Sequence, residues 1–255
     1  MKIATWNVNS LTVRLPHVLE WAKSAEPDIL ALQEIKLPTE VFPLDRLSEA
    51  GYHAISSGQK TYNGVATISR AAPADLLTDI PGFEDPQRRV LVATIDGVRV
   101  VNLYVPNGQT VGSLHYEYKL GWLAAVREYL AAEMAVHENL VVLGDFNIAP
   151  QDADVYDPVA WGEDIHCSPS ERAALQEILK LGLVDLFRQF EQPEKTFSWW
   201  DYRAGKFRRN AGLRIDLILA SPAMASRCTA SYVDRDPRTW ERPSDHAPVV
   251  AEFAL

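Results

Sequence analysis

Short apolar runs recur along the whole chain, and each has the length of a β-strand. They are rich in strand-favouring residues and are bounded by polar or turn-forming ones. We predict strands at Ile3–Trp6, Ile29–Leu32, Val65–Ile68, Val90–Ile95, Val98–Val105, Leu140–Leu143, Ile215–Ala220 and Val249–Phe253. Asp96-Gly97 separates two of these runs, and this pair predicts a tight hairpin because both turn positions need a positive φ. Some neighbouring strands should therefore be antiparallel.

Three stretches between the strands show helical periodicity, at Leu15–Ala25, His115–His137 and Glu171–Leu181. Strands dominate and helices separate groups of them, which predicts two packed sheets covered by helices, a layered α/β sandwich. Periodicity alone leaves a doubly wound sheet open as the alternative. The 255 residues fit one large α/β domain or two small ones, and no repeat or long linker divides them.

Composition limits the classes of function. No apolar run approaches the ~20 residues of a membrane-spanning helix, so we expect no membrane partner. The N-terminus turns polar by its seventh residue and offers no signal peptide, so a cytoplasmic location is the default expectation. The net charge of −9 argues mildly against nucleic acid, although a local basic segment such as Lys206–Asn210 can coexist with an acidic remainder. Cys167 and Cys228 have no metal-binding spacing and are expected to be reduced.

Polar residues cluster where the predicted strands begin or end, and strand ends are where side chains converge in sheet proteins. The set comprises Asn7, Glu34, Asp145, Asn147, Asp216, Asp245 and His246. Glu34, Asp245 and Asn7 offer the oxygen ligands that suit magnesium or manganese rather than zinc. Such an ion would offset the charge that develops in phosphoryl transfer.

The remaining members of the set suit proton transfer. Asp145 could orient or deprotonate a water, with Asn147 holding the water or the phosphate. His246 could be paired with a carboxylate that keeps its ring protonated toward a phosphate, and Asp216 is the candidate. Each residue alone has a structural explanation, such as a turn for Asp145-Phe146-Asn147 or a helix cap at Asp245. Together they favour an active site.

Several motifs resemble those of the exonuclease III family of DNA-repair nucleases, within the endonuclease/exonuclease/phosphatase superfamily. They are Lys2–Ser10, Leu32–Lys36, Tyr62–Ala66, Leu143–Ala149, Gly212–Asp216 and Ser244–Pro248, to which Phe197–Arg203 adds a likeness to the DNA-repair branch. The motifs run in order from residue 2 to residue 253. The resemblance implies a four-layer α/β sandwich of two mixed sheets, one domain over residues 1–255, and a magnesium-dependent phosphodiesterase that could also use manganese.

The resemblance also assigns roles. Asn7 and Glu34 look like metal-site residues, with Asp245 beside the metal and imidazole groups. Asp145, Asn147, Asp216 and His246 look like the catalytic set, and Tyr104 like the family tyrosine near the scissile phosphate. The partner of His246 stays open between Asp216 and Asp245. Residues expected to face DNA are Arg208, Arg209, Asn210, Trp200 and His166. The implied substrate is duplex DNA with damaged or blocked 3′ ends, bound by a monomer.

His166 departs from the pattern, because some abasic-site endonucleases of the family have Gly at this position. An imidazole there would obstruct an abasic nucleotide swung out of the duplex more than it would obstruct a frayed 3′ end. We therefore predict that 3′-end processing and 3′→5′ exonuclease activity exceed abasic-site incision. The alternative is that His166 points to solvent and leaves full abasic endonuclease activity.

Two other functions compete with DNA hydrolysis. The superfamily includes phosphatases of inositol phosphates and phospholipid head groups, against which the tryptophan cluster Trp199-Trp200 and the Arg208-Arg209 loop weigh modestly. A catalytically dead binding module is the second alternative, and the complete polar set argues against it.

Overall fold

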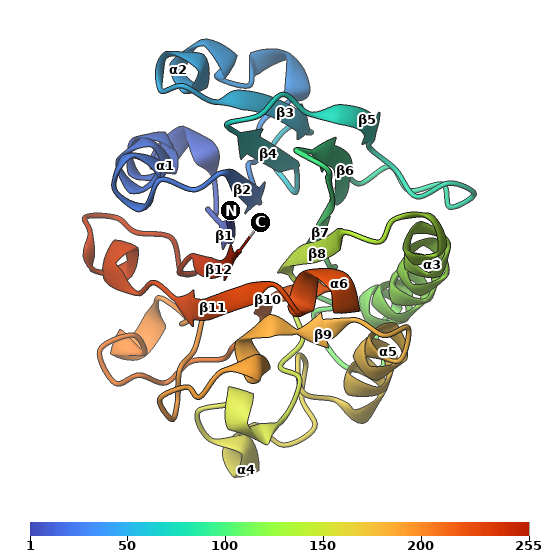
Figure 1. Cartoon of the computed structure of the whole chain (residues 1–255). Helices are drawn as coiled ribbons and strands as arrows, with labels where there is room; N and C mark the ends of the chain where they lie inside the picture. The colour runs from blue at the N-terminus through green and yellow to red at the C-terminus, as the bar shows by residue number, and fades with distance from the viewer. Residues whose placement is uncertain (255) are drawn as a thin grey trace.

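A computed structural model describes residues 1–254 and shows two six-stranded sheets packed face to face (Figure 1). The strand order of the first sheet is β11-β12-β1-β2-β4-β3. Its strands are β1 (Lys2–Asn7), β2 (Ile29–Gln33), β3 (His53–Ser57), β4 (Val65–Ser69), β11 (Cys228–Val233) and β12 (Val249–Phe253). The strand order of the second sheet is β5-β6-β7-β8-β10-β9. Its strands are β5 (Ala74–Leu77), β6 (Val90–Ile95), β7 (Val98–Tyr104), β8 (Leu140–Asp145), β9 (Val184–Asp185) and β10 (Asp216–Ala220).

Helices cover the outer faces of both sheets (Figure 1). The helices are α1 (Leu11–Ala25), α2 (Leu44–Glu49), α3 (Leu114–Val136), α4 (Pro158–Trp161), α5 (Pro169–Leu179) and α6 (Pro222–Ala225). Trp21 of α1 packs against Trp6 of the first sheet, and Trp122 of α3 lies in the core against the second. A third apolar layer, which includes Ile3, Leu143 and Ile218, fills the space between the sheets. The predicted four-layer α/β sandwich is therefore confirmed, and the doubly wound alternative is wrong.

All eight predicted strands are present, and the four that were missed are the four edge strands, β3, β5, β9 and β11. Edge strands cover less of the core: β5 is largely exposed, and only one residue of β11 is buried. Their sequences therefore lack the continuous apolar runs that reveal a central strand. The first helix also starts earlier than predicted, at Leu11, so that Pro16 lies inside the helix rather than at its beginning.

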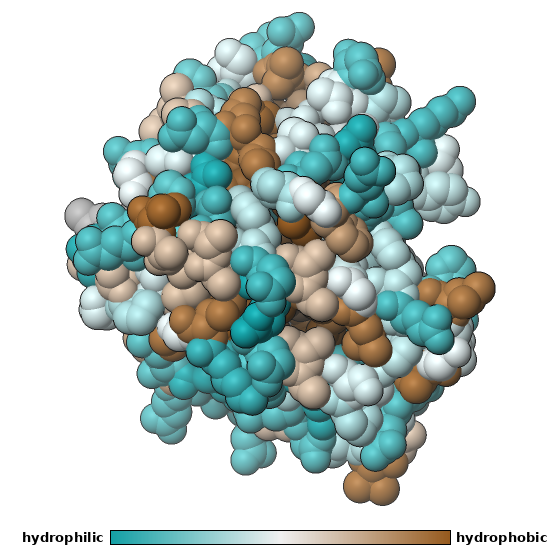
Figure 2. Space-filling view, turned by 90° about the vertical axis from the view of Figure 1, so that its right-hand side faces the viewer, coloured by the Kyte–Doolittle hydropathy of each residue, from teal (hydrophilic) through white to brown (hydrophobic). Residues whose placement is uncertain are grey.

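The hairpin between β6 and β7 forms as predicted, with Asp96 and Gly97 both at positive φ and Ile95 opposite Val98. The surface over α3 and α5 is mostly hydrophilic, with hydrophobic residues in separate small groups (Figure 2). No helix among residues 1–254 is long and apolar enough to cross a membrane.

Strand direction brings the polar strand ends together. β1 runs parallel to β2, so Asn7 at the end of β1 lies near Glu34, which follows β2. β7 runs parallel to β8 and places Tyr104 beside Asp145, while antiparallel β10 starts opposite β8 with Asp216 beside Asp145. Both sheets therefore present their polar ends at the same edge of the sandwich.

Candidate active site

Asn7, Glu34 and Asp145 meet at this edge from three different strand ends. The Asn7 side-chain nitrogen donates hydrogen bonds to Glu34 Oε1 and to Asp145 Oδ2, each at 2.9 Å. The Asn7 side-chain oxygen accepts from the backbone N–H of Asn9 at 3.0 Å, which fixes the orientation of the amide. Asn7 thus holds two carboxylates by its nitrogen, whereas a ligand role had been predicted for its oxygen.

Two backbone positions next to the carboxylates, Glu34 and Gly144, have unusual geometry. Glu34 itself lies at φ 50°, a region that side chains other than Asn and Asp rarely adopt. Gly144, one residue before Asp145, approaches β7 so closely that a Cβ atom would lie 1.8 Å from the carbonyl oxygen of Leu103. Glycine is therefore required immediately before the central carboxylate. Strained positions of this kind gather at functional sites.

His246 approaches the carboxylates from the loop before β12 and pairs with Asp216. Its Nδ1 lies 2.9 Å from Asp216 Oδ2 and 3.1 Å from Asp216 Oδ1, and its Nε2 lies 3.8 Å from Asp145 Oδ2. The question of the histidine's partner, open between Asp216 and Asp245, is settled in favour of Asp216. The hydrogen bond at Nδ1 leaves Nε2 facing Asp145.

The buried charges shift one another's pKa values. Burial alone would lower the pKa of His246, but the Asp216 and Asp145 carboxylates outweigh it and raise the pKa to about 10. Burial raises the pKa of Asp145 to about 7, against the opposing effect of the His246 charge. His246 is therefore protonated at neutral pH, while Asp145 is poised to gain or lose a proton.

Glu34, Asp145 and His246 offer ligand atoms within 4.8 Å of one another, and they include two oxygen donors suited to a hard cation. Oxygen donors suit such an ion better than a ring nitrogen, so Glu34 and Asp145 are the candidate ligands of this set. This pair fits a magnesium-type site with open positions. Asp145, predicted as a catalytic residue only, thus also becomes a candidate ligand.

Asp245 lies beside this cluster with both of its oxygens engaged. Asn9 Nδ2 donates to Asp245 Oδ1 and Trp199 Nε1 donates to Asp245 Oδ2, each at 3.0 Å. Its predicted role at the metal stays a prediction. Asn9 also accepts from Lys36, which forms an ion pair with Glu34 at 2.9 Å. The sequence analysis did not single out Asn9 or Lys36, although both stand within the motifs it used.

Tyr104 and Asn147 complete the predicted catalytic group. Burial, together with the charges of Glu34 and Asp145, raises the pKa of Tyr104 well above its usual value, so its hydroxyl is a neutral hydrogen-bond donor. Asn147 has a left-handed backbone at φ 51°. Its N–H donates to Asp145 Oδ1 at 2.9 Å, and its side-chain nitrogen donates to the Val105 carbonyl at 3.0 Å.

His166 lies in the site rather than in solvent, with an exposed fraction of 5%. Its ring centroid is 6.1 Å from that of Trp199 and 6.4 Å from that of Trp161, and Nδ1 bonds the Asn147 carbonyl at 2.7 Å. Trp199 in turn packs against His246 at 6.5 Å. The alternative that His166 points to solvent is wrong.

The aromatic cluster divides into a core part and a surface part. Trp200 is fully buried, stacks edge-on against Phe207 and donates to Asn210, so the prediction that Trp200 contacts DNA directly is wrong. Its neighbour Trp199 is half-buried beside His166 and His246. Sequence alone could not distinguish adjacent tryptophans, because the chain here forms isolated bridges rather than a regular strand.

The loop predicted to face DNA is basic and exposed at Arg208 and Arg209, while the Asn210 side chain is occupied by Trp200 and by the Lys195 carbonyl. The basic segment thus lies on the surface, where phosphate contacts are possible.

A fully buried ion pair between Lys119 of α3 and Glu171 of α5 was not predicted from the sequence; its charged atoms are 2.5 Å apart. Lys119 donates to the Asn147 carbonyl at 2.7 Å. A signal was present, because Lys119 stands three, four and seven residues before Trp122, Leu123 and Val126 on the buried stripe of its helix. A lysine on such a stripe needs a partner.

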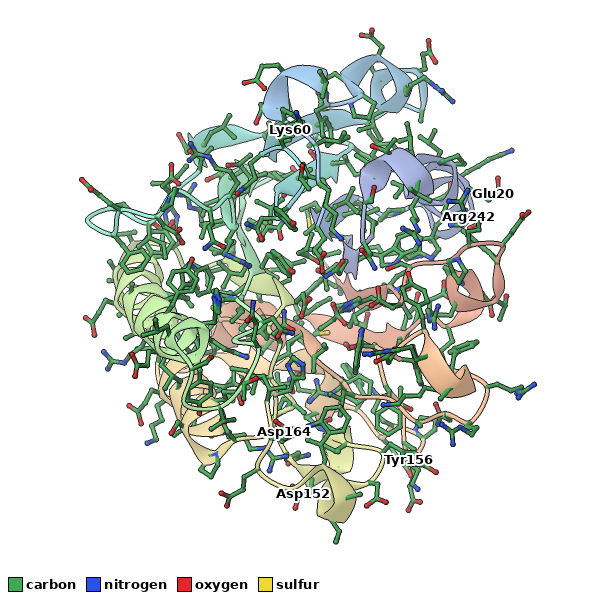
Figure 3. The ribbon with its side chains drawn as sticks, turned by 180° about the vertical axis from the view of Figure 1, so that it is seen from behind. Glu20, Lys60, Asp152, Tyr156, Asp164 and Arg242 are labelled. Atoms are coloured by element: carbon green, nitrogen blue, oxygen red, sulfur yellow. The ribbon has the colours of Figure 1, made fainter. Side chains whose placement is uncertain are left out.

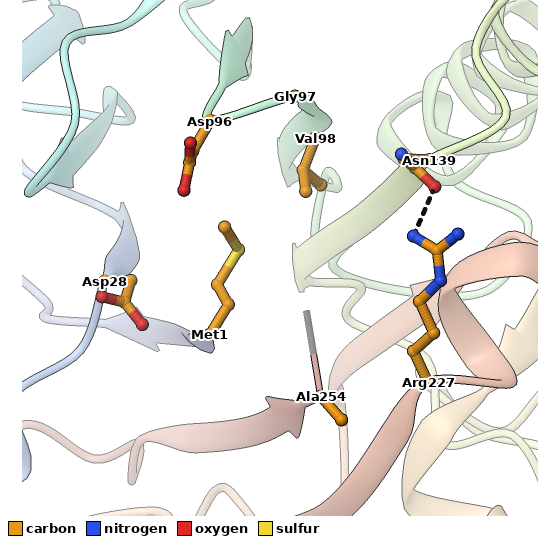
Figure 4. Close-up of a pocket in the computed structure, with 8 residues that line it drawn as sticks. All are labelled: Met1, Asp28, Asp96, Gly97, Val98, Asn139, Arg227 and Ala254. Atoms are coloured by element: carbon orange, nitrogen blue, oxygen red, sulfur yellow. Dashed lines mark hydrogen bonds between the residues drawn. The ribbon is translucent and has the colours of Figure 1, made fainter.

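A large cavity of about 680 Å³ lies at the other end of the sandwich (Figure 4). Its lining includes Met1, which precedes β1, and Asn139, which precedes β8 and accepts a hydrogen bond from Arg227 at 3.2 Å. These residues stand at the starts of strands whose opposite ends carry Asn7 and Asp145. The polar cluster therefore has no part in this hollow.

Comparison with known proteins agrees with this geometry. A model of the endonuclease/exonuclease/phosphatase family matches residues 4–246. Exodeoxyribonuclease III of Haemophilus influenzae is 36% identical over 267 residues, covering 99% of this chain and all of the relative.

Three solved structures are similar over their full length and over all of this chain. The 3′-5′ exonuclease NExo from Neisseria meningitidis is 53% identical with a TM-score of 0.98. An AP endonuclease from Archaeoglobus fulgidus is 40% identical with a TM-score of 0.95. A second NExo structure, titled as a 3′ phosphatase bound to a product DNA hairpin, is 52% identical with a TM-score of 0.98. By its complete strand-end cluster, its sandwich and these relatives, the chain belongs to the exonuclease III group of the endonuclease/exonuclease/phosphatase family of hydrolases.

Proposed function

We propose that this protein is a magnesium-dependent DNA-repair phosphodiesterase that removes 3′-blocking groups and degrades duplex DNA from its 3′ ends. One observation carries the proposal: the Asn7–Glu34–Asp145 group and the His246–Asp216 pair meet at one edge of the sandwich, 3.8 Å apart at their nearest charged atoms. The relatives that act on DNA 3′ ends support the choice of substrate.

The residues have complementary roles in this proposal. Asp145, held by Asn7 and by the Asn147 N–H, orients the attacking water and accepts its proton. Protonated His246, held by Asp216, faces a phosphate oxygen through Nε2 and stabilises the charge that builds on it. Neutral Tyr104 donates a hydrogen bond at the phosphate, and Asn147 keeps Asp145 oriented through its N–H.

Glu34 and Asp145 would hold the magnesium ion, with manganese as a substitute, and Asn7 would keep both carboxylates in place. When bound, the ion would neutralise phosphate charge in the transition state. We keep Asp245 as a further residue near the metal, because its carboxylate is fixed by Asn9 and Trp199 rather than free to solvent.

DNA binding is assigned to the exposed Arg208 and Arg209, which would contact phosphates and add affinity without sequence preference. Trp199 and His166 together would form the wall against which the terminal sugar or base rests. We expect the protein to act as a monomer and as one domain over residues 1–255.

The wall formed by Trp199 and His166 is also the reason why we expect 3′-end processing to exceed abasic-site incision. His166 is packed between Trp161 and Trp199 and tied to Asn147, so its ring cannot swing out of the pocket without breaking these contacts. A nucleotide turned out of an intact duplex needs that space, whereas a frayed 3′ terminus can approach from the side. Full abasic endonuclease activity is the alternative, which the Archaeoglobus relative keeps open.

A panel of substrates tests the proposal directly. Duplexes with a 3′-phosphate, a plain 3′ end or an internal abasic site, and inositol phosphates, are each incubated with the protein and magnesium. We expect rapid 3′-phosphate release and 3′→5′ degradation, slower abasic incision and no inositol phosphate hydrolysis. Preferred hydrolysis of inositol phosphate would contradict the DNA assignment.

Asp145→Asn should abolish cleavage, with Glu20→Gln as the matched control, since Glu20 is an exposed carboxylate on α1 (Figure 3). Tight DNA binding by the wild-type protein without any turnover would instead support the binding-module alternative. Activity retained in Asp145→Asn would show that the cluster is not the active site.

A further inference from the structure

We infer that Lys119 is a positioning residue of the active site. Through a buried hydrogen-bond network it holds the turn at Asn147, and with it the Asp145 carboxylate, in place. The inference rests on the proposed function, because it takes the cluster around Asp145 as the site of reaction. Lys119 lies on α3, and its side chain is fully buried. Nothing in the proposed chemistry uses it directly.

The ammonium group of Lys119 has three acceptors, each on a different segment. It donates to the Asn147 carbonyl after β8 at 2.7 Å, to the Asn107 carbonyl after β7 at 3.1 Å, and to Glu171 Oε1 on α5 at 2.5 Å. An ammonium group has three donors, so all are used. One side chain thereby ties together two loops of the site and the helix behind them.

Asn147 connects Lys119 to the Asp145 carboxylate. Its carbonyl faces Lys119, its N–H donates to Asp145 Oδ1 at 2.9 Å, and its side-chain oxygen accepts from Asn107 at 3.2 Å. The residue lies in the left-handed region at φ 51°, which Asn adopts more readily than most residues. A shift of the carbonyl would therefore change the direction of the hydrogen bond to Asp145.

His166 shares two of the three acceptors of Lys119. Its Nδ1 bonds the same Asn147 carbonyl at 2.7 Å, and its N–H donates to Glu171 Oε1 at 3.1 Å. Glu171 also closes the helix cap with Ser168, whose hydroxyl donates to Glu171 Oε2 at 2.6 Å. The network thus couples the wall of the pocket to the turn that orients Asp145.

A purely structural role is the competing explanation, and the chain contains a matched pair to test it. Arg99 of β7 and Glu133 of α3 form another buried ion pair, with Nε and Oε2 2.6 Å apart. This pair also joins α3 to its surroundings, but Arg99 stands at the start of β7, away from Tyr104 at the strand's other end. Removing either cation leaves a buried acid unpaired and should destabilise the fold.

The experiment compares Lys119→Met, Lys119→Arg and Arg99→Met in the full chain, measuring kcat and KM for 3′-phosphate release with magnesium. We expect Lys119→Met to lower kcat by about 100-fold, the scale of a small misplacement of a catalytic group, with KM little changed. Lys119→Arg should recover part of the rate, because it keeps the charge and the donors. Arg99→Met should lose stability but keep kcat. Equal losses of kcat in Lys119→Met and Arg99→Met, or none in Lys119→Met, would overturn the inference.

Hydrogen exchange gives a readout that does not depend on catalysis. Residues 145–149 should exchange faster in Lys119→Met than in Arg99→Met at matched stability, because only the first loses the anchor of the Asn147 carbonyl. Unchanged exchange there overturns the inference even if the proposed DNA activity is correct. If the wild-type protein cleaves no DNA, faster exchange in Lys119→Met than in Arg99→Met would still support the positioning role and would reject only the proposed function.

If Lys119→Met fails to fold, Lys119→Met with Glu171→Gln replaces the ion pair by neutral side chains of similar size. Glutamine can still close the cap with Ser168. The double variant should show the same loss of kcat and the same faster exchange. Wild-type kcat in that variant would overturn the positioning role.

Discussion

His246 and His166 both pack against Trp199 and are similarly buried, at 4% and 5% exposure, yet their surroundings favour opposite charge states. Asp216 and Asp145 raise the pKa of His246 to about 10. Burial and the Lys119 charge lower the pKa of His166 to about 4, although its bond to the Asn147 carbonyl opposes them. At neutral pH one ring is a cation and the other is neutral. Both rings are buried, so burial alone does not decide the charge of a histidine. The sign of the charges on neighbouring groups decides it.

The two states suit different tasks. A protonated ring beside the carboxylates can stabilise charge on a phosphate. A neutral ring packed between Trp161 and Trp199 is an apolar wall with one hydrogen bond, suited to a sugar or base. The comparison predicts that changes on the His246 side alter the rate of hydrolysis, whereas changes on the His166 side alter which substrate is accepted.

The largest effect should come from removing the carboxylate that keeps His246 charged. Asp216→Asn leaves the ring in place but takes away its counter-charge, so we expect kcat to fall by about 10²- to 10⁴-fold, the range of a general acid or base. The measurement is 3′-phosphate release under saturating substrate and magnesium. An Asp216→Asn protein that keeps wild-type kcat would contradict the role given to the pair.

A second large effect should appear in substrate choice. His166→Gly opens the pocket, and we expect abasic-site incision to rise at least about tenfold relative to 3′-phosphate release, as steric differences in a pocket produce. The variant should fold, because glycine is well suited to the φ of 74° at this position. His53→Gly is the control, since His53 is exposed on edge strand β3. No gain in incision would defeat the proposal that His166 limits it.

Some features of the fold and of the site could be predicted from the sequence alone, and others could not. The eight central strands could be predicted because their two faces are buried, which leaves long apolar runs, whereas the four edge strands left no such signal. The strand-end residues around Asp145 could be predicted because strand ends converge. The partner of His246 could not, since Asp216 and Asp245 are both near it and only the fold selects one.

The environment of His166 was harder still to predict. Burial and the charge of Lys119, 47 positions earlier, keep His166 neutral, and the charge of Glu171 opposes them. Such contacts join residues that share no motif, so no local pattern reveals them. The prediction that Trp200 contacts DNA is wrong for the same reason, because the burial of Trp200 depends on Phe207 and on the close approach of Gly212.

The dependence of stability on pH should separate the two histidines by sign. The pKa of His246 is raised in the folded protein, so its stabilising contribution is complete below about 6.5 and is lost as pH rises toward 10. The pKa of His166 is lowered, so its contribution is present above about 6.5 and is lost as pH falls toward 4.

Urea unfolding of metal-free protein across pH 4 to 10 checks this with His246→Gln and His166→Gln. Each group can change the free energy of unfolding by at most about 1.4 kcal/mol per pH unit. His246→Gln should flatten the alkaline side of the profile and His166→Gln the acidic side. Two variants that flatten the same side would contradict the opposite charge states.

The smallest effect should be a change in the pKa of His166 itself when Lys119 is replaced. Burial is the larger cause of the low value, and Lys119 the second, so Lys119→Met should raise the pKa from about 4 without restoring the ordinary 6.5. The Glu171 charge, no longer neutralised, acts in the same direction. NMR titration of the ring protons measures the shift, with His246 as an internal reference in the same sample. A pKa of His166 that stays unchanged would mean that burial alone keeps the ring neutral, and the contrast between the two histidines would then rest on the carboxylates around His246 only.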